Sequence, residues 1–311
     1  MAEVLWLAFA VMARMNDRFA RVGELDIAYQ TLGDPSDPSI LLVMGLGMHL
    51  IHWDLELCRQ LADRGFHVVR YDNRDAGRST LIDAPVPNAM RAMAGLPIDS
   101  PYLLGDMAGD AFGLLDHLGI ERAHVLGASM GGMIGQEMAI RRPERVLSLA
   151  SLMSTTGERR HGRPKLRLWS LFVHRAPRRR DDYVEYFLRV FRMVGSPGFP
   201  ADEARLRELA AATYERGHHP AGTGRQLAAI MASGDRTDRL RGLRVPTVVI
   251  HGTDDPLVPF RGGVATARAI PDAELIAIPG MGHDLPREVW PKIIDAVVTN
   301  AERAVAAAAP A

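Results

Sequence analysis

The segment Gly127-Ala128-Ser129-Met130-Gly131-Gly132 most constrains what this chain can fold into. It begins directly after residues 123–126, which we expect to form a strand, and it leads into residues 130–141, which have a helical pattern. A strand that turns into a helix this abruptly holds its central residue in a strained backbone conformation, so the neighbouring residues must be small. The segment therefore predicts a tight strand–turn–helix unit that exposes the Ser129 hydroxyl at the end of a sheet strand.

Short apolar segments alternate with helical segments through most of the chain. We expect strands at residues 18–20, 26–31, 40–44, 67–71, 123–126, 146–152, 245–251 and 274–278. We expect helices at residues 50–62, 107–118, 130–141, 263–269 and 289–301. Because parallel neighbours need long crossover connections, this alternation predicts an α/β fold with a mostly parallel, eight-stranded type of sheet and helices on both faces.

The alternation stops between residues 155 and 241, a segment that we call the insertion. It has helical patterns at residues 183–194, 204–214 and 225–231 but no convincing strand, and it is too long for a loop. We expect it to form a helical lid over the carboxyl ends of the strands, where open α/β sheets bind ligands, with residues 18–154 and 242–311 as the core. Its larger apolar side chains would form the lid's own core or line a mainly apolar pocket: Leu168, Trp169, Leu171, Phe172, Tyr183, Tyr186, Phe187 and Phe191.

The charge balance argues against nucleic acid as a partner. Lys and Arg together number 37, as do Asp and Glu, whereas proteins that bind nucleic acid need a basic surplus. Cys58 is the only cysteine, so no disulfide can form within the chain. We expect a cytoplasmic protein that acts on a small molecule.

Residues 1–17 are expected to form an apolar N-terminal arm. Residues 4–13 are apolar without interruption, but a membrane span needs about 20 such residues, and no positive charge or clean cleavage site marks a secretory signal. Three interpretations stay open: an arm packed on this subunit or on a partner in a homo-oligomer, a peripheral membrane anchor, or a natural start at Met15. We favour the packed arm.

A serine hydroxyl is a weak nucleophile that needs a base, and the base needs an orienting acid. His283 is the candidate base because it follows the last expected strand in the flexible turn Gly280-Met281-Gly282-His283. Two carboxylates, Asp254 and Asp255, follow the strand at residues 245–251. We prefer Asp255, which stands three residues after a glycine and just before a proline, and Asp254 remains the alternative.

The negatively charged oxygen that forms during acyl transfer needs two backbone N–H donors. We expect one from Met130, the residue after the nucleophile, and one from Leu46 in the loop Met44-Gly45-Leu46-Gly47. His49 and His52 have a spacing that could bind a metal, but no third ligand is nearby. The sequence therefore predicts neither a metal site nor a cofactor.

These segments resemble the α/β-hydrolase superfamily, and specifically its lid-bearing esterase branch, which includes the aclacinomycin methylesterases. The resemblance covers residues 18–298 and is carried by residues 72–79, 127–132, 251–256 and 280–283. It implies that Ser129, Asp255 and His283 form a catalytic triad, in the order along the chain that this superfamily uses, and that Leu46 and Met130 supply the oxyanion hole. The turn at residues 72–79 resembles a structural turn of the family. Met44 stands where many relatives have a histidine, a change that a backbone donor should tolerate.

The resemblance implies a carboxylic-ester hydrolase that acts on small to medium acyl or aromatic substrates through an acyl-enzyme. The same triad could cleave a C–C bond in a β-diketone-like substrate or form peracids, so these activities are alternatives. Dehalogenases and epoxide hydrolases use a carboxylate where this chain has Ser129. A non-catalytic small-molecule binder with the same fold is an alternative from another class.

Overall fold

The computed structural model of this chain describes residues 17–88, 98–162, 165, 168 and 177–308. The expected N-terminal arm, apart from its last residue Asp17, lies outside the described residues, as do the expected lid residues Trp169, Leu171 and Phe172. Within the described part of the chain, no helix is both long and apolar enough to cross a lipid bilayer.

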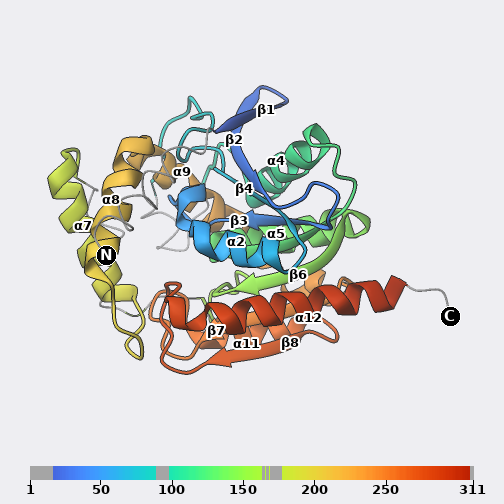
Figure 1. The fold of residues 1–311 in the computed structure, drawn as a ribbon. Helices are drawn as coiled ribbons and strands as arrows, with labels where there is room; N and C mark the ends of the chain where they lie inside the picture. The colour runs from blue at the N-terminus through green and yellow to red at the C-terminus, as the bar shows by residue number, and fades with distance from the viewer. Residues whose placement is uncertain (1–16, 89–97, 163–164, 166–167, 169–176, 309–311) are drawn as a thin grey trace.

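Eight strands form one sheet in the order β1-β2-β4-β3-β5-β6-β7-β8 (Figure 1). Only the pairs β1–β2 and β2–β4 are antiparallel, and the remaining pairs are parallel, which confirms the predicted fold class. Their bounds are β1 (Arg18–Val22), β2 (Leu25–Leu32), β3 (Ser39–Val43), β4 (His67–Tyr71), β5 (Ala123–Ala128), β6 (Val146–Leu152), β7 (Thr247–Gly252) and β8 (Glu274–Ile278).

Helices cover both faces of the sheet (Figure 1). On one face, α2 (Leu55–Asp63) and α12 (Trp290–Ala308) pack on a cluster of buried side chains that includes Leu61 and Ile293. On the other face, α4 (Leu104–His117), α5 (Met130–Arg141) and α11 (Phe260–Ala269) pack on a second cluster. Short 3-10 helices lie at η1 (Leu50–His52), η2 (Pro143–Arg145) and η4 (Arg287–Val289).

The single helix expected at residues 50–62 is wrong, because the structure has two separate elements there, η1 and α2. The break lies at Asp54, whose carboxylate accepts a hydrogen bond of 2.7 Å from the Glu56 amide. Asp54 is thus the N-cap of α2, a position at which aspartate is strongly preferred. The spacing of apolar residues did not indicate this break, because Leu50 before the cap and Leu55 after it are both buried.

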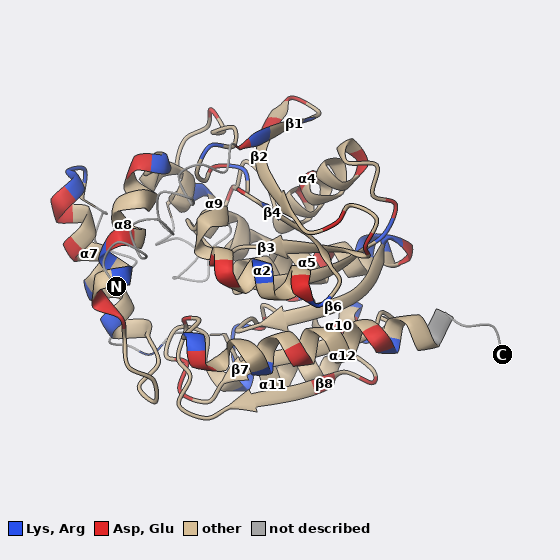
Figure 2. Cartoon of the chain, in the orientation of Figure 1, with Lys and Arg blue, Asp and Glu red and all other residues tan. Residues whose placement is uncertain are grey.

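The insertion contains four described helices between β6 and β7: α7 (Arg180–Val194), α8 (Glu203–Gly217), α9 (Pro220–Ser233) and α10 (Thr237–Leu240). Helices α7 and α8 pack against each other through a small apolar cluster of their own, which includes Phe187 and Ala210. Charges of both signs are interspersed along these two helices (Figure 2), where Arg207, for example, pairs with Glu185.

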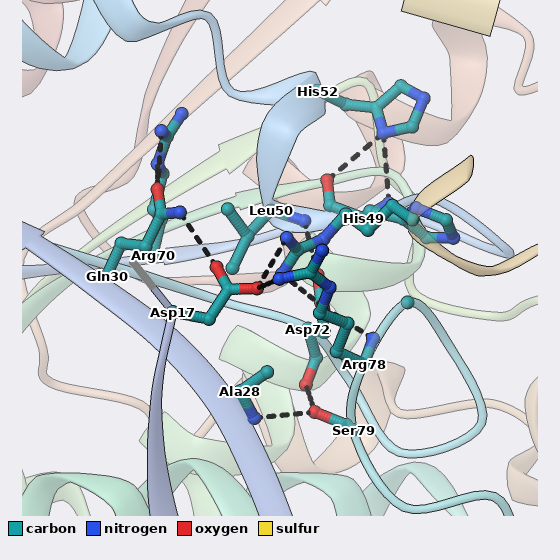
Figure 3. A network of polar contacts seen from close by, with 12 residues as sticks. Asp17, Ala28, Gln30, His49, Leu50, His52, Arg70, Asp72, Arg78 and Ser79 are labelled. Atoms are coloured by element: carbon teal, nitrogen blue, oxygen red, sulfur yellow. Dashed lines mark hydrogen bonds and ion pairs between the residues drawn. The ribbon is translucent and has the colours of Figure 1, made fainter. Parts of the chain in front are cut away.

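Arg216, at the end of α8, ties the insertion to the first strands of the core. Its guanidinium donates hydrogen bonds of 2.7 Å to both Asp17 and Asp72. The Asp72 carboxylate also accepts the amides of Leu50 and Arg78 (Figure 3). Burial opposes the charge of Arg216, but Asp72 and Asp17 outweigh burial and raise the pKa of the guanidinium. The Arg78 guanidinium also pairs with Asp17, at 2.7 Å, but among the described residues only Arg216 offers a guanidinium to Asp72.

We expect Arg216→Leu to lower the free energy of unfolding by about 3–5 kcal/mol, because it leaves the buried Asp72 carboxylate without its guanidinium partner. Urea unfolding followed by circular dichroism measures this loss.

Arg207→Leu is the matched control on the same helix. Its partner is Glu185, and the two side chains are 47% and 60% exposed, so the expected loss is about 0–1 kcal/mol. Equal losses in the two variants would show that Arg216 contributes no more than a surface residue.

Candidate active site

Ser129 lies in the turn between β5 and α5, with φ 56° and ψ −117°. A positive φ at a residue other than glycine costs about 1–3 kcal/mol and persists only where the surroundings enforce it. Here the neighbouring strand does so: the Ser129 amide donates to the Leu152 carbonyl at 2.9 Å, and the Ser154 hydroxyl donates to the Ser129 carbonyl at 2.8 Å. The strain holds the Ser129 side chain at the carboxyl end of β5.

The glycines around Ser129 are required by close approach of the backbone. A Cβ atom at Gly131 would lie 2.0 Å from the Val43 carbonyl oxygen, and one at Gly127 would lie 2.2 Å from the Gly131 carbonyl oxygen. Any side chain at either position would push α5 away from β3 and β5. The glycines therefore let the helix start directly behind Ser129.

The structure brings Ser129, His283 and Asp255 together from the loops that follow β5, β8 and β7. His283 Nε2 lies 3.0 Å from Ser129 Oγ, and His283 Nδ1 lies 2.6 Å from Asp255 Oδ2. This geometry lets the hydroxyl donate to Nε2 while Nδ1–H donates to the carboxylate. The arrangement can activate a serine for attack on an electrophilic carbon.

Asp255, rather than Asp254, faces the imidazole. The other oxygen of the Asp255 carboxylate accepts the amides of Leu257 and Val258, both at 2.8 Å, so the side chain is fixed. Asp254 is exposed and instead accepts hydrogen bonds from Thr253 Oγ1 and the Gly280 amide. Adjacent side chains thus diverge, and only one carboxylate reaches His283.

Asp255 is buried yet ionised. Burial by itself would raise the pKa of this carboxyl, but the charge of His283 and the hydrogen bonds from His251 and His283 outweigh burial and hold its pKa at about 2. The carboxylate is therefore charged at neutral pH, where it can orient the imidazole and stabilise its protonated form.

The two expected oxyanion donors lie on either side of Ser129. Met130 is the first residue of α5, so its amide has no carbonyl one turn back within the helix. Leu46 lies in the loop after β3, and a Cβ atom at the preceding Gly45 would lie only 3.2 Å from Ser129 Cβ. The Leu46 amide makes no hydrogen bond to any other residue that the structure describes. Both amides are thus available to an incoming oxygen.

The loop that carries His283 is braced by the end of α7, a contact that the sequence did not indicate. The His283 amide donates to the Val194 carbonyl at 2.7 Å. Ser196 Oγ accepts the Gly282 amide at 2.8 Å and donates to the Asp284 carboxylate, whose pKa is raised by burial. The insertion therefore helps to fix the backbone that presents the imidazole.

A cavity of about 1650 Å³ lies between the carboxyl ends of the strands and the insertion, and Ser129 and His283 line it. Aromatic side chains also line it, among them Tyr183, Tyr186, Phe187, Phe191 and Trp290. The expected lid aromatics that fall within the described residues thus face the cavity or pack beside it.

Four histidines also line the cavity: His49, His52, His218 and His219. Burial, with a smaller effect from neighbouring cationic groups, lowers the pKa of His49 and of His52 to about 3, so both are neutral. No group of three or more His, Cys, Asp or Glu side chains in the described part of the chain is arranged to hold a metal ion. The sequence did not indicate that the pair His49 and His52 lines the same cavity as the pair His218 and His219, because the two pairs lie far apart along the chain.

Comparison with known proteins finds a matching family profile, similar proteins and a similar solved structure. The profile of the family described as alpha/beta hydrolase fold matches residues 38–286. Rhodomycin D methylesterase DauP of Streptomyces sp. (strain C5) is 28% identical over 93% of this chain and 99% of that protein. Rhodomycin D methylesterase DnrP of Streptomyces peucetius is 28% identical over the same shares. The structure of a thermophilic esterase from Thermogutta terrifontis superposes with a TM-score of 0.71 at 21% identity, over 93% of this chain and 99% of that one, and shows the same fold.

We expect Asp255→Asn to lower the rate of acyl transfer from an activated ester by about 10⁴-fold, because the amide cannot hold the required tautomer of His283. Asp254→Asn is the matched control and should retain a rate within a few-fold of the native chain. Initial rates with p-nitrophenyl acetate measure both. Similar losses in the two variants would contradict the assignment of Asp255.

Proposed function

The chain belongs to the alpha/beta hydrolase family, and on this basis we propose that it hydrolyses carboxylic esters through an acyl-enzyme on Ser129. The observation that carries the proposal is the chain of hydrogen bonds from Ser129 Oγ to His283 Nε2 and from His283 Nδ1 to Asp255, at the wall of a large cavity. A binding protein has no need for a hydroxyl aligned with a base and an ionised carboxylate.

In the proposed mechanism, Ser129 Oγ attacks the ester carbonyl while His283 Nε2 takes its proton. The amides of Met130 and Leu46 stabilise the negatively charged oxygen of the tetrahedral intermediate. His283 then gives the proton to the leaving alcohol, and an acyl-enzyme forms. Water attacks the acyl-enzyme with His283 again as the base, which releases the acid and restores the serine.

The cavity supports an ester with an apolar acyl or aromatic group. At about 1650 Å³ it is larger than the roughly 300–1,000 Å³ of ordinary small-molecule pockets, so it can accept aromatic substrates of considerable size. The aromatic side chains of α7 offer ring faces for stacking. The relatives DauP and DnrP are named as methylesterases, which supports methyl esters as the first substrates to examine.

We expect a fluorophosphonate to react with the protein and to leave its adduct on Ser129, as determined by mass spectrometry of the digested protein. Ser129→Ala should show no adduct, and native protein should hydrolyse p-nitrophenyl esters of short and medium acyl chains and methyl esters of aromatic acids. Absence of the adduct would overturn the proposal. An adduct without turnover of any ester would favour C–C bond hydrolysis or peracid formation on the same residues.

A further inference from the structure

Gln226 connects the insertion to the loop that is expected to stabilise the oxyanion. It lies on α9 and is completely buried, and both ends of its amide are used. Its Oε1 accepts the Gly47 amide at 2.8 Å, and its Nε2 donates to the Arg74 carbonyl at 2.7 Å. One side chain of the insertion thus holds two backbone groups of the core, and one of them lies next to Leu46.

The loop from Gly45 to Met48 is a tight turn, and the Leu46 amide belongs to its first peptide, between Gly45 and Leu46. The Met48 amide donates to the Gly45 carbonyl at 3.2 Å, and Gly47 has φ 66°. A positive φ at the third position of such a turn is typical of type II, which differs from type I by rotation of the central peptide. That central peptide carries the Gly47 amide, the group that Gln226 holds. Gln226 therefore holds one of the two orientations of the Leu46–Gly47 peptide. The Leu46 N–H lies in the preceding peptide, whose Gly45 carbonyl accepts the Met48 amide, so its direction depends on this turn staying intact.

Helix α9 is itself held firmly against the core. Arg225 makes two hydrogen bonds to the buried Asp75 carboxylate, of 2.9 and 2.6 Å, and the Tyr102 hydroxyl donates to the same carboxylate at 2.7 Å. Thr223, one turn before Gln226, packs so closely on Gly47 that a Cβ atom there would lie 2.7 Å from its hydroxyl. The position of Gln226 is thus determined by its neighbours on α9.

We propose that Gln226 is a positioning residue for the oxyanion hole, and that the insertion in this way supplies part of the catalytic scaffold. By holding the Gly47 amide it fixes the turn that directs the Leu46 N–H toward the oxygen of the tetrahedral intermediate. The inference rests on the proposed function, since it concerns a step of that mechanism. Without Gln226 the half-buried Gly47 amide loses its acceptor, and the turn can relax to another shape.

Gln226→Met removes both hydrogen bonds with little change in side-chain length. We expect kcat for a p-nitrophenyl ester, counted per site titrated with fluorophosphonate, to fall about 10- to 100-fold, since displacing or losing an oxyanion donor has effects of this order. KM should change by no more than about twofold. If this variant does not fold, Gln226→Asn can replace it, because asparagine keeps the amide but is too short to reach Gly47. It should show the same fall in kcat with little change in KM.

The matched control is Gln136→Met. Gln136 is equally buried and also joins the insertion to the core, because it accepts a hydrogen bond of 3.0 Å from Arg236, but it does not contact the loop after β3. If Gln226 only stabilises the fold, the two variants should lose stability and activity alike. Thermal unfolding of both variants measures their stability.

A trifluoromethyl ketone distinguishes positioning from general damage. It adds to Ser129 Oγ and forms an anionic tetrahedral adduct, so its inhibition constant reports the oxyanion hole. In Gln226→Met this constant should rise by the same factor by which kcat/KM falls, and in Gln136→Met it should stay unchanged. An unchanged constant in Gln226→Met would overturn the inference. If the native protein itself reacts with neither the ketone nor the fluorophosphonate, the proposed function fails instead.

Discussion

The close approach of α5 to the sheet is the constraint on which the rest of the site depends. Ser129 keeps its strained conformation because Gly127 and Gly131 allow the helix to start against β3 and β5 without a side chain between them. The same approach places the Met130 amide at a helix N-terminus and sets Ser129 beside Gly45. If α5 lay farther out, the serine could relax, and its distances to the base and to the loop after β3 would both change.

Buried polar contacts help to hold the insertion on the core. Arg216, Arg225 and Gln226 all meet the turn after β4, where they bind the Asp72 and Asp75 carboxylates and the Arg74 carbonyl. Such contacts add less net stability than apolar packing of the same volume, but a buried polar group left without its hydrogen-bond partner is strongly destabilising. They therefore specify one position for the helices while leaving the cavity beneath them unfilled. The turn at residues 72–79, which resembles a structural turn of the family, is therefore a place where the insertion packs on the core.

Elements that depend on local chemistry could be predicted from the sequence. The runs of buried residues in β3, β4 and β5 indicated strands, and the glycines around Ser129 indicated the sharp turn into α5. Where a local signal was overlooked, the prediction was wrong: the cap at Asp54 divides the helix expected at residues 50–62. Gln226 gave no signal at all, since a glutamine in a helical pattern looks like any surface residue until its partners are known.

The sequence by itself determined most strands, the turn that carries Ser129 and the set of candidates for acid, base and oxyanion donors, because each depends on residues that are neighbours along the chain. Only the tertiary structure decided between Asp254 and Asp255, since adjacent carboxylates diverge and the loop after β8 meets just one of them. It likewise decided that the insertion reaches the Gly47 amide. Directions of side chains across a fold depend on contacts between distant segments, and spacing along one segment does not specify them.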